Sequence, residues 1–104
     1  MRVVSEEVFA PVAVVEKFTH FDDAVEMANQ SKYGLQAGVF TRDLARARYA
    51  GDKLEFGGVL INDVPTFRVD NMPYGGVKES GFGREGVRYA MEEMTETKII
   101  IVNS

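Results

Sequence analysis

A glycine-rich stretch at residues 81–86 is the first feature of this sequence that suggests a ligand. It reads GFGREG and matches G-x-G-x-x-G, a pattern whose glycines let the backbone approach a pyrophosphate at a helix start. In a dinucleotide site this pattern follows a strand, and an acid lies about 20 residues further on. Here it follows a loop containing Lys78, and no acid comes after Lys98. We therefore interpret it as a flexible loop that leads into a helix.

Other reactive side chains are few. The sequence has no cysteine and one histidine, which excludes disulfides, thiolate metal ligands and a cysteine nucleophile. A single His20 cannot form a histidine cluster, so we expect no metal site. The acid pairs Asp22-Asp23 and Glu92-Glu93 would point about 100° apart on a helix and would not converge on one site. We assign no catalytic residue.

Composition indicates one soluble globular domain. The chain has 104 residues, 45% hydrophobic and 27% charged, and a formal net charge of −4. Charges of neither sign form a block, so nucleic acid is not an expected partner. The longest apolar runs, 12–15 and 99–102, are far shorter than the ~20 residues of a membrane span. The first residues lack the apolar stretch of a secretory signal, which predicts a cytoplasmic protein.

The elements that must position a site alternate between strands and helices. Residues 13–18 are rich in β-branched side chains and predict a strand, and Thr19 begins a predicted capping box and helix. That helix carries an apolar stripe of Phe21, Ala24, Val25 and Ala28 and ends before Gly34. Residues 36–40 predict a second strand, and 59–62 a third that is buried on both faces.

Between these two strands, residues 44–54 predict a helix. Its apolar positions are Leu44, Ala47, Gly51 and Leu54, Thr41 is a possible cap, and Gly57-Gly58 would close the helix in left-handed geometry. The resulting β-α-β-α-β order predicts an α/β fold whose strands form part of a parallel sheet. Helical spacing also predicts a helix with apolar residues at Val87, Ala90, Met91 and Met94.

The remaining segments carry the predicted function and the predicted assembly. Residues 63–83 form an irregular segment longer than most loops, which marks it as functional. Residues 98–102 read KIIIV and predict a terminal strand. An unpaired apolar edge of this kind favours pairing with a second chain, so we expect a homo-oligomer; the alternative is that the strand folds back onto its own sheet.

Five segments, taken in order, resemble motifs of the aldehyde dehydrogenase superfamily, and the resemblance covers Glu6 to Val102. The family motifs are E-E-x-F-G-P-V, Y-G-L-x-A-x-V-F-T-x-D, G-x-V-x-(I/V)-N, P-F-G-G-x-K-x-S-G-x-G-R-E and T-E-x-K. They correspond here to residues 6–12, 33–43, 57–62, 73–85 and 95–98. Residues 66–71 resemble the branch that acts on lactaldehyde and, without phosphorylation, on glyceraldehyde phosphate.

The resemblance implies a dehydrogenase that oxidises an aldehyde to a carboxylic acid with NAD or NADP through a cysteine thioester. It covers about the last fifth of the family's usual length, and the family's cysteine lies upstream of it. Residues 1–94 would be the C-terminal part of the catalytic domain, and 95–104 an oligomerisation strand. We therefore expect this chain alone to be inactive and to bind no cofactor tightly. The alternative is a non-catalytic assembly or binding module that pairs with intact subunits.

Site residues follow from the same resemblance. Glu7 matches the glutamate that accepts hydrogen bonds from the nicotinamide ribose, and Phe9 an aromatic residue beside the cofactor. Phe67, Arg68 and Tyr74 would line the substrate entrance, where an arginine suits a small anionic aldehyde. A surface pair of Arg68 with Asp70 explains the arginine almost as well. Glu85 is a possible proton relay, although a position in the first turn of a helix would also account for an acid there.

Overall fold

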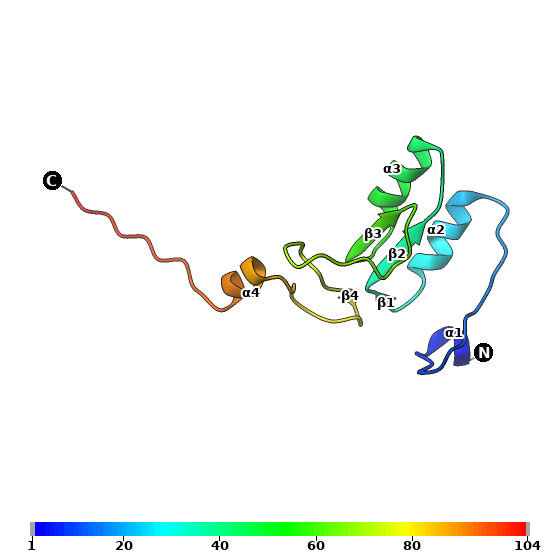
Figure 1. Cartoon of the computed structure of the whole chain (residues 1–104), viewed down its shortest axis with the longest axis horizontal. Helices are drawn as coiled ribbons and strands as arrows, with labels where there is room; N and C mark the ends of the chain where they lie inside the picture. The colour runs from blue at the N-terminus through cyan, green and yellow to red at the C-terminus, as the bar shows by residue number, and fades with distance from the viewer. Residues whose placement is uncertain (1, 104) are drawn as a thin grey trace.

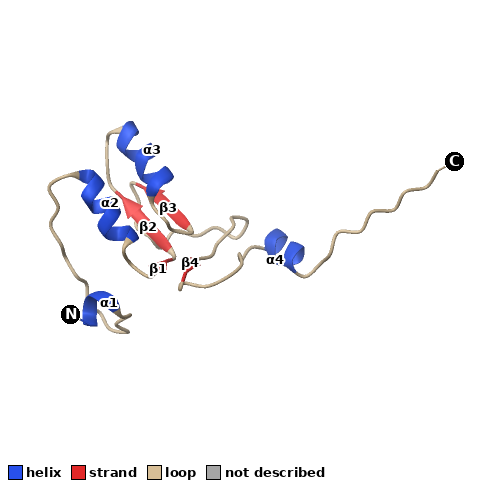
Figure 2. Cartoon of the chain, turned by 180° about the vertical axis from the view of Figure 1, so that it is seen from behind, coloured by secondary structure: helices blue, strands red, loops and turns tan. Residues whose placement is uncertain are grey.

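The computed structural model describes residues 2–103 and contains four helices and four short strands in the order α1-α2-β1-β2-α3-β3-β4-α4 (Figure 1). The helices are α1 (Arg2–Ser5), α2 (Phe21–Asn29), α3 (Leu44–Lys53) and α4 (Val87–Glu93). The strands are β1 (Tyr33–Gly34), β2 (Gln36–Val39), β3 (Gly58–Ile61) and β4 (Val77–Lys78). Figure 2 shows α2 and α3 lying together beside the β2–β3 pair, with α4 apart from them.

The β2-α3-β3 unit is the centre of the fold. Strands β2 and β3 pair in parallel, with Gln36 opposite Gly58 and Val39 opposite Ile61, and α3 makes the connection between them. The predicted strand at 13–18 is wrong: this segment is exposed and has no strand partner within residues 2–103. A β-branched run becomes a strand only where a neighbour supplies ladder hydrogen bonds. The predicted burial of the third strand on both faces is also wrong: β3 is half-buried up to Leu60, and Ile61 is exposed.

Helix α2 buries the predicted stripe. Val25 is 5% exposed, and the other positions of the stripe are half-buried. The predicted capping box is wrong, because the N-cap is His20 and no side chain caps the helix. The Phe21 ring packs against Tyr49 of α3, with ring centroids 6.2 Å apart, so the two helices meet through their aromatic residues.

Helix α3 begins at a different cap from the predicted one. The Asp43 carboxylate accepts hydrogen bonds from the Ala45 and Arg46 N–H groups, while Thr41 Oγ1 accepts one from Asp43. Ala50 is fully buried, whereas Leu44, assigned to the apolar stripe, is 83% exposed. The helix ends at Lys53, followed by an extended Leu54. Gly57 and Gly58 are therefore not a left-handed cap, and neither has a positive φ.

Asn62 closes the other end of the unit. It has a left-handed φ of 60° directly after β3, and its Oδ1 accepts a hydrogen bond of 2.8 Å from the Thr41 N–H. Asparagine tolerates this conformation better than most residues because its short amide bonds locally. The amide thus ties the end of β3 to the loop between β2 and α3, in agreement with a structural role at this position.

The long segment after β3 is attached to this unit by a pairing that the sequence patterns did not predict. Strand β4 runs antiparallel to β1, with Tyr33 opposite Lys78 and Gly34 opposite Val77. Both strands have two residues, too short for a periodic pattern to reveal. The pairing fixes the middle of the otherwise irregular segment 63–86 against β1. We call α2, β1 and the β2-α3-β3 unit together the β–α unit.

The last residues form no strand within the described chain. Residues 95–103 run away from α4 in an extended path (Figure 1), and Ile99, Ile100 and Ile101 are each 79% exposed. The predicted strand at 98–102 is therefore wrong for the chain by itself, and so is the alternative that it folds back onto its own sheet. Its composition favours pairing, but residues 2–103 place no partner edge beside it.

Little of the apolar surface is buried. Within residues 2–103, Val25 and Ala50 are the hydrophobic residues that are buried, and the radius of gyration is 18.0 Å. A compact domain of about 100 residues has a radius near 13 Å. The fold thus positions its loops on a small β–α unit and leaves large apolar faces uncovered.

Candidate functional site

Three of the predicted site residues meet at one point. Arg68 Nη2 lies 2.6 Å from Glu85 Oε2, and the guanidinium carbon of Arg68 lies 4.7 Å from the centroid of the Tyr74 ring. The alternative partner is therefore wrong: Arg68 pairs with Glu85 and not with Asp70. The Arg68 and Glu85 side chains are 49% and 62% exposed, so the pair is open to an incoming ligand.

The backbone holds two of these residues side by side. Tyr74 and Glu85 exchange two backbone hydrogen bonds as an isolated antiparallel bridge. Residues 74–85 thus form a closed loop with Tyr74 and Glu85 at its base. Arg84 braces the inside of the loop, since its Nη1 donates to the Gly76 carbonyl at 2.9 Å and to the Gly83 carbonyl at 2.7 Å.

The G-x-G-x-x-G glycines serve the loop itself. Gly81, Gly83 and Gly86 have φ values of 125°, 73° and 112°, a region that side-chain-bearing residues rarely adopt. Gly86 is the N-cap of α4, which agrees with a loop leading into a helix. Glu85 lies before this cap, so its assignment to the first turn of a helix is wrong.

Phe67 faces different surroundings from Arg68. It borders an open hollow of about 380 Å³ beside β3, together with Gln36 and Met72. Its backbone carbonyl accepts a hydrogen bond of 3.0 Å from Gln36 Nε2, which anchors the segment to β2. Arg68, Tyr74 and Glu85 are not among the residues that line this hollow. The structure thus groups three of the four substrate-side candidates and separates Phe67 from them.

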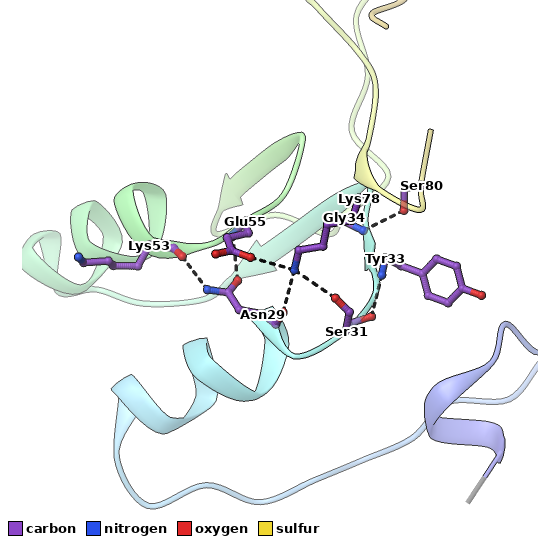
Figure 3. Close-up of polar contacts among 8 residues, drawn as sticks. All are labelled: Asn29, Ser31, Tyr33, Gly34, Lys53, Glu55, Lys78 and Ser80. Atoms are coloured by element: carbon purple, nitrogen blue, oxygen red, sulfur yellow. Dashed lines mark hydrogen bonds and ion pairs between the residues drawn. The ribbon is translucent and has the colours of Figure 1, made fainter. Parts of the chain in front are cut away.

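Lys78 and Ser80, which the sequence patterns did not mark as site residues, hold the loop in place (Figure 3). The Lys78 ammonium donates to the Asn29 carbonyl at 2.7 Å and to the Ser31 carbonyl at 3.1 Å, and lies 3.2 Å from Glu55 Oε2. Ser80 Oγ accepts a hydrogen bond of 2.8 Å from the Gly34 N–H. Lys78 and Ser80 are the K and S of the K-x-S part of the 73–85 motif, and this motif was the sequence feature that could have indicated their role.

A second lysine crosses the same edge on the surface. Lys32 Nζ lies 2.9 Å from Glu79 Oε2, and this hydrogen bond and charge raise the pKa of Lys32 above its ordinary value. The two side chains are 47% and 61% exposed, so solvent screens the pair strongly. Lys78, 23% exposed, is the more enclosed of the two lysines.

The predicted cofactor residues lie elsewhere on the chain. Glu7 and Phe9 follow α1 on a segment that stands apart from α4 in both overall views (Figures 1 and 2). Phe9 is 92% exposed, and the Glu7 side chain has no ion pair or hydrogen bond within residues 2–103. Both side chains are thus open to solvent.

The described part of the chain contains neither a metal-binding cluster nor a membrane-spanning helix. Across residues 2–103 no three histidine, aspartate or glutamate side chains gather in a way that could hold a metal ion. No helix in the same range has the length and apolarity to cross a membrane.

Comparison with known proteins identifies the relatives of this chain. The model of the aldehyde dehydrogenase family matches residues 1–100. A lactaldehyde dehydrogenase of Methanococcus aeolicus is 56% identical over 98 residues, which are 94% of this chain and 21% of that protein. The chain therefore spans about a fifth of the length of the curated relatives it matches.

Solved structures of the same kind superimpose on the chain. Aldehyde dehydrogenase 21 of Physcomitrella patens, crystallised with the product succinate, matches with a TM-score of 0.93 and 50% identity, over 97% of this chain and 21% of its own. A glyceraldehyde-3-phosphate dehydrogenase of Methanocaldococcus jannaschii, complexed with NADP, matches with a TM-score of 0.78 and 51% identity, over 83% of this chain and 19% of its own.

Proposed function

The chain belongs to the aldehyde dehydrogenase family, and on that premise we propose that it forms the C-terminal part of an enzyme that oxidises a small aldehyde to its carboxylic acid. The observation that carries the proposal is the match to the family over residues 1–100. The sequence has no cysteine, so a thiol nucleophile has to come from outside these 104 residues. We propose that the chain alone is inactive for this reason.

In the proposed reaction the aldehyde carbon loses a hydride and gains a water oxygen, and one proton is released. NAD or NADP, when bound, supplies the hydride acceptor. Glu7 would accept hydrogen bonds from the ribose hydroxyls, and the exposed Phe9 ring would pack against the cofactor. Glu85 would relay a proton near the aldehyde, with its carboxylate held by Arg68 at 2.6 Å.

For the substrate we propose a small anionic aldehyde, bound through Arg68. The guanidinium is half-exposed and has one carboxylate partner, so several of its five N–H donors remain for a second anion. Tyr74 and Phe67 would line the path of the carbon chain. Relatives named for phosphorylated and neutral aldehydes, glyceraldehyde 3-phosphate and lactaldehyde, define the range to be tested.

A chimeric enzyme tests the proposal directly. In the Methanococcus aeolicus lactaldehyde dehydrogenase, the 98-residue segment that aligns with this chain is replaced by this chain. We expect aldehyde-dependent reduction of NAD or NADP by the chimera and none by the 104-residue chain. The control carries the same segment with Glu7→Ala, which should weaken cofactor binding. Turnover by the isolated chain, or none by a correctly folded chimera, would overturn the proposal.

The second candidate is an assembly module that pairs with intact subunits, with 1–94 completing a catalytic domain and 95–104 adding a strand to a partner. The exposed terminal isoleucines favour it, because an apolar extended segment requires cover. The two candidates predict different results when the chain is mixed with the intact relative and the mixture is separated by size. A module co-elutes with active subunits, whereas a piece of an enzyme binds the relative only when the relative lacks the matching segment.

A further inference from the structure

Lys78 stands out as a residue whose backbone and side chain are both committed to one position. Its φ is 55°, a left-handed conformation that side-chain-bearing residues rarely adopt. Its ammonium has three donors, and three acceptors surround it: the Asn29 and Ser31 carbonyls and the Glu55 carboxylate. A surface lysine without a role would have no reason to hold such a conformation.

The acceptors of Lys78 are themselves fixed. Asn29 is the last residue of α2, where carbonyl groups lack helical partners and the helix dipole favours a cation. The Asn29 amide donates to the Lys53 carbonyl at 2.7 Å and accepts from the Glu55 N–H at 2.9 Å. The ends of α2 and α3 are thus joined, and Lys78 binds at their junction (Figure 3).

A second contact reinforces this junction two residues further on. Ser80 Oγ accepts from the Gly34 N–H, and the Glu79 N–H donates to the Lys32 carbonyl at 3.0 Å. Gly34 leaves no space for adjustment, since a Cβ there would lie 2.7 Å from the Glu55 carbonyl oxygen and 2.8 Å from the Val77 side chain. We call the contacts of Lys78 and Ser80 with the β–α unit the loop clamp.

The candidate site is built on the same loop that the loop clamp holds. Tyr74 and Glu85 are the paired ends of the closed loop 74–85, and Arg68 contacts both of their side chains. We propose that Lys78 is a positioning residue for the aldehyde dehydrogenase reaction, which fixes the loop so that Tyr74, Glu85 and Arg68 meet the substrate together. This proposal rests on the proposed function, and it assigns Lys78 no contact with substrate or cofactor.

The first test measures the clamp without any reaction. Amide hydrogen exchange of the 104-residue chain is compared for the wild type, Lys78→Met and the control Lys32→Met. Lys32 forms a lysine–glutamate pair across the same edge, but its ammonium bonds no backbone carbonyl within residues 2–103. We expect the backbone N–H groups of Gly34 and Glu79 to exchange faster in Lys78→Met and at the wild-type rate in Lys32→Met. The backbone N–H of Asn62, which donates to the Val39 carbonyl between β2 and β3, should exchange at the wild-type rate in both variants. Equal exchange in the two variants would overturn the clamp.

The second test uses the chimeric enzyme. Lys78→Met should raise the aldehyde KM about tenfold or more, because small displacements of a positioning group cost large factors in rate and binding. Cofactor affinity and the melting temperature should stay close to wild type, which separates positioning from general unfolding. Glu55→Gln, which keeps the lysine, should raise KM by about two- to threefold.

Each outcome of these tests supports or overturns the positioning role of Lys78. An unchanged aldehyde KM in both variants overturns the positioning role, and so does a parallel fall in cofactor affinity and melting temperature in Glu55→Gln. If Lys78→Met does not fold, Glu55→Gln and Lys78→Arg test the positioning role instead. The planar guanidinium of Lys78→Arg cannot reproduce all the contacts of the ammonium, so we expect an aldehyde KM that stays above the wild-type value. No turnover by the unmodified chimera overturns the proposed function, whereas hydrogen exchange still decides whether the clamp exists.

Discussion

Arg68 and Glu85 form a direct ion pair although 17 positions separate them in the sequence, with Nη2 and Oε2 2.6 Å apart. The arginine also lies over the Tyr74 ring, 4.7 Å from its centroid. Its charge therefore has a partner before any ligand arrives, and an anionic substrate has to share the guanidinium with Glu85 or displace that carboxylate. This relationship links the two proposed roles, anion binding and proton relay, in one pair of side chains.

Arg68→Ala in the chimeric enzyme tests the anionic substrate. Hydrogen bonds to charged groups are worth about 1.5–3 kcal/mol, so kcat/KM for glyceraldehyde 3-phosphate should fall by roughly ten- to a hundredfold. Loss for lactaldehyde, which has no anionic group, should be much smaller. Arg88→Ala is the matched control, because Arg88 forms an exposed pair with Glu92 on α4. An unchanged ratio of the two rates rules out Arg68 as the anion-binding residue.

Two glycines give opposite predictions for the same substitution. Gly51 lies inside α3, and a Cβ there meets nothing within 4 Å, so Gly51→Ala should stabilise the fold by about 0.5–1 kcal/mol. Gly57 faces the backbone of the loop, and a Cβ there would overlap the Gly75 carbonyl. Gly57→Ala should therefore displace the loop and lower both the unfolding free energy and the chimera's activity. Urea unfolding compares the two, and similar effects would contradict this packing.

The cap of α3 gives a third prediction. Asp43 Oδ1 accepts a hydrogen bond of 2.8 Å from the Ala45 N–H, so Asp43→Ala should destabilise the fold by about 1 kcal/mol. Asp43→Asn keeps an acceptor oxygen and should retain most of the stability. Asp52→Asn, in the last turn of the same helix, is the control for loss of a negative charge. Circular dichroism during urea titration measures the unfolding free energy of all three variants. Equal unfolding curves for Asp43→Ala and Asp52→Asn would show that the Asp43 cap does not stabilise the fold.

The extended tail predicts association. Ile99 to Ile101 are exposed and have no strand partner within residues 2–103, so the 104-residue chain should form dimers or larger assemblies as its concentration rises. Ile100→Lys places a charge in the middle of this edge and should shift the equilibrium toward monomer. Light scattering over a wide concentration range makes the measurement. A wild-type chain that stays monomeric throughout would refute the predicted oligomer.

Local patterns were enough to predict most of the regular elements. Helices α2, α3 and α4 and strands β2 and β3 lie where hydrophobic periodicity and short apolar runs place them, within a few residues. The reason is that an amphipathic helix or a short apolar strand depends on its own side chains for most of its signal. The family resemblance was equally local, since it rested on motifs read in order, and the match over residues 1–100 confirms it.

What the sequence determined by itself is therefore the family, the central β2-α3-β3 unit and the lack of a cysteine in these 104 residues. Only the tertiary structure decided which segments pair. Residues 13–18 and 98–102 have strand composition but no neighbouring edge in the described part of the chain, whereas the two-residue strands β1 and β4 pair with each other. It also decided that Arg68 bonds Glu85 and that Lys78 binds the end of α2. Such contacts join residues far apart in the chain, and their free energy depends on the positions of both partners, which no local pattern contains.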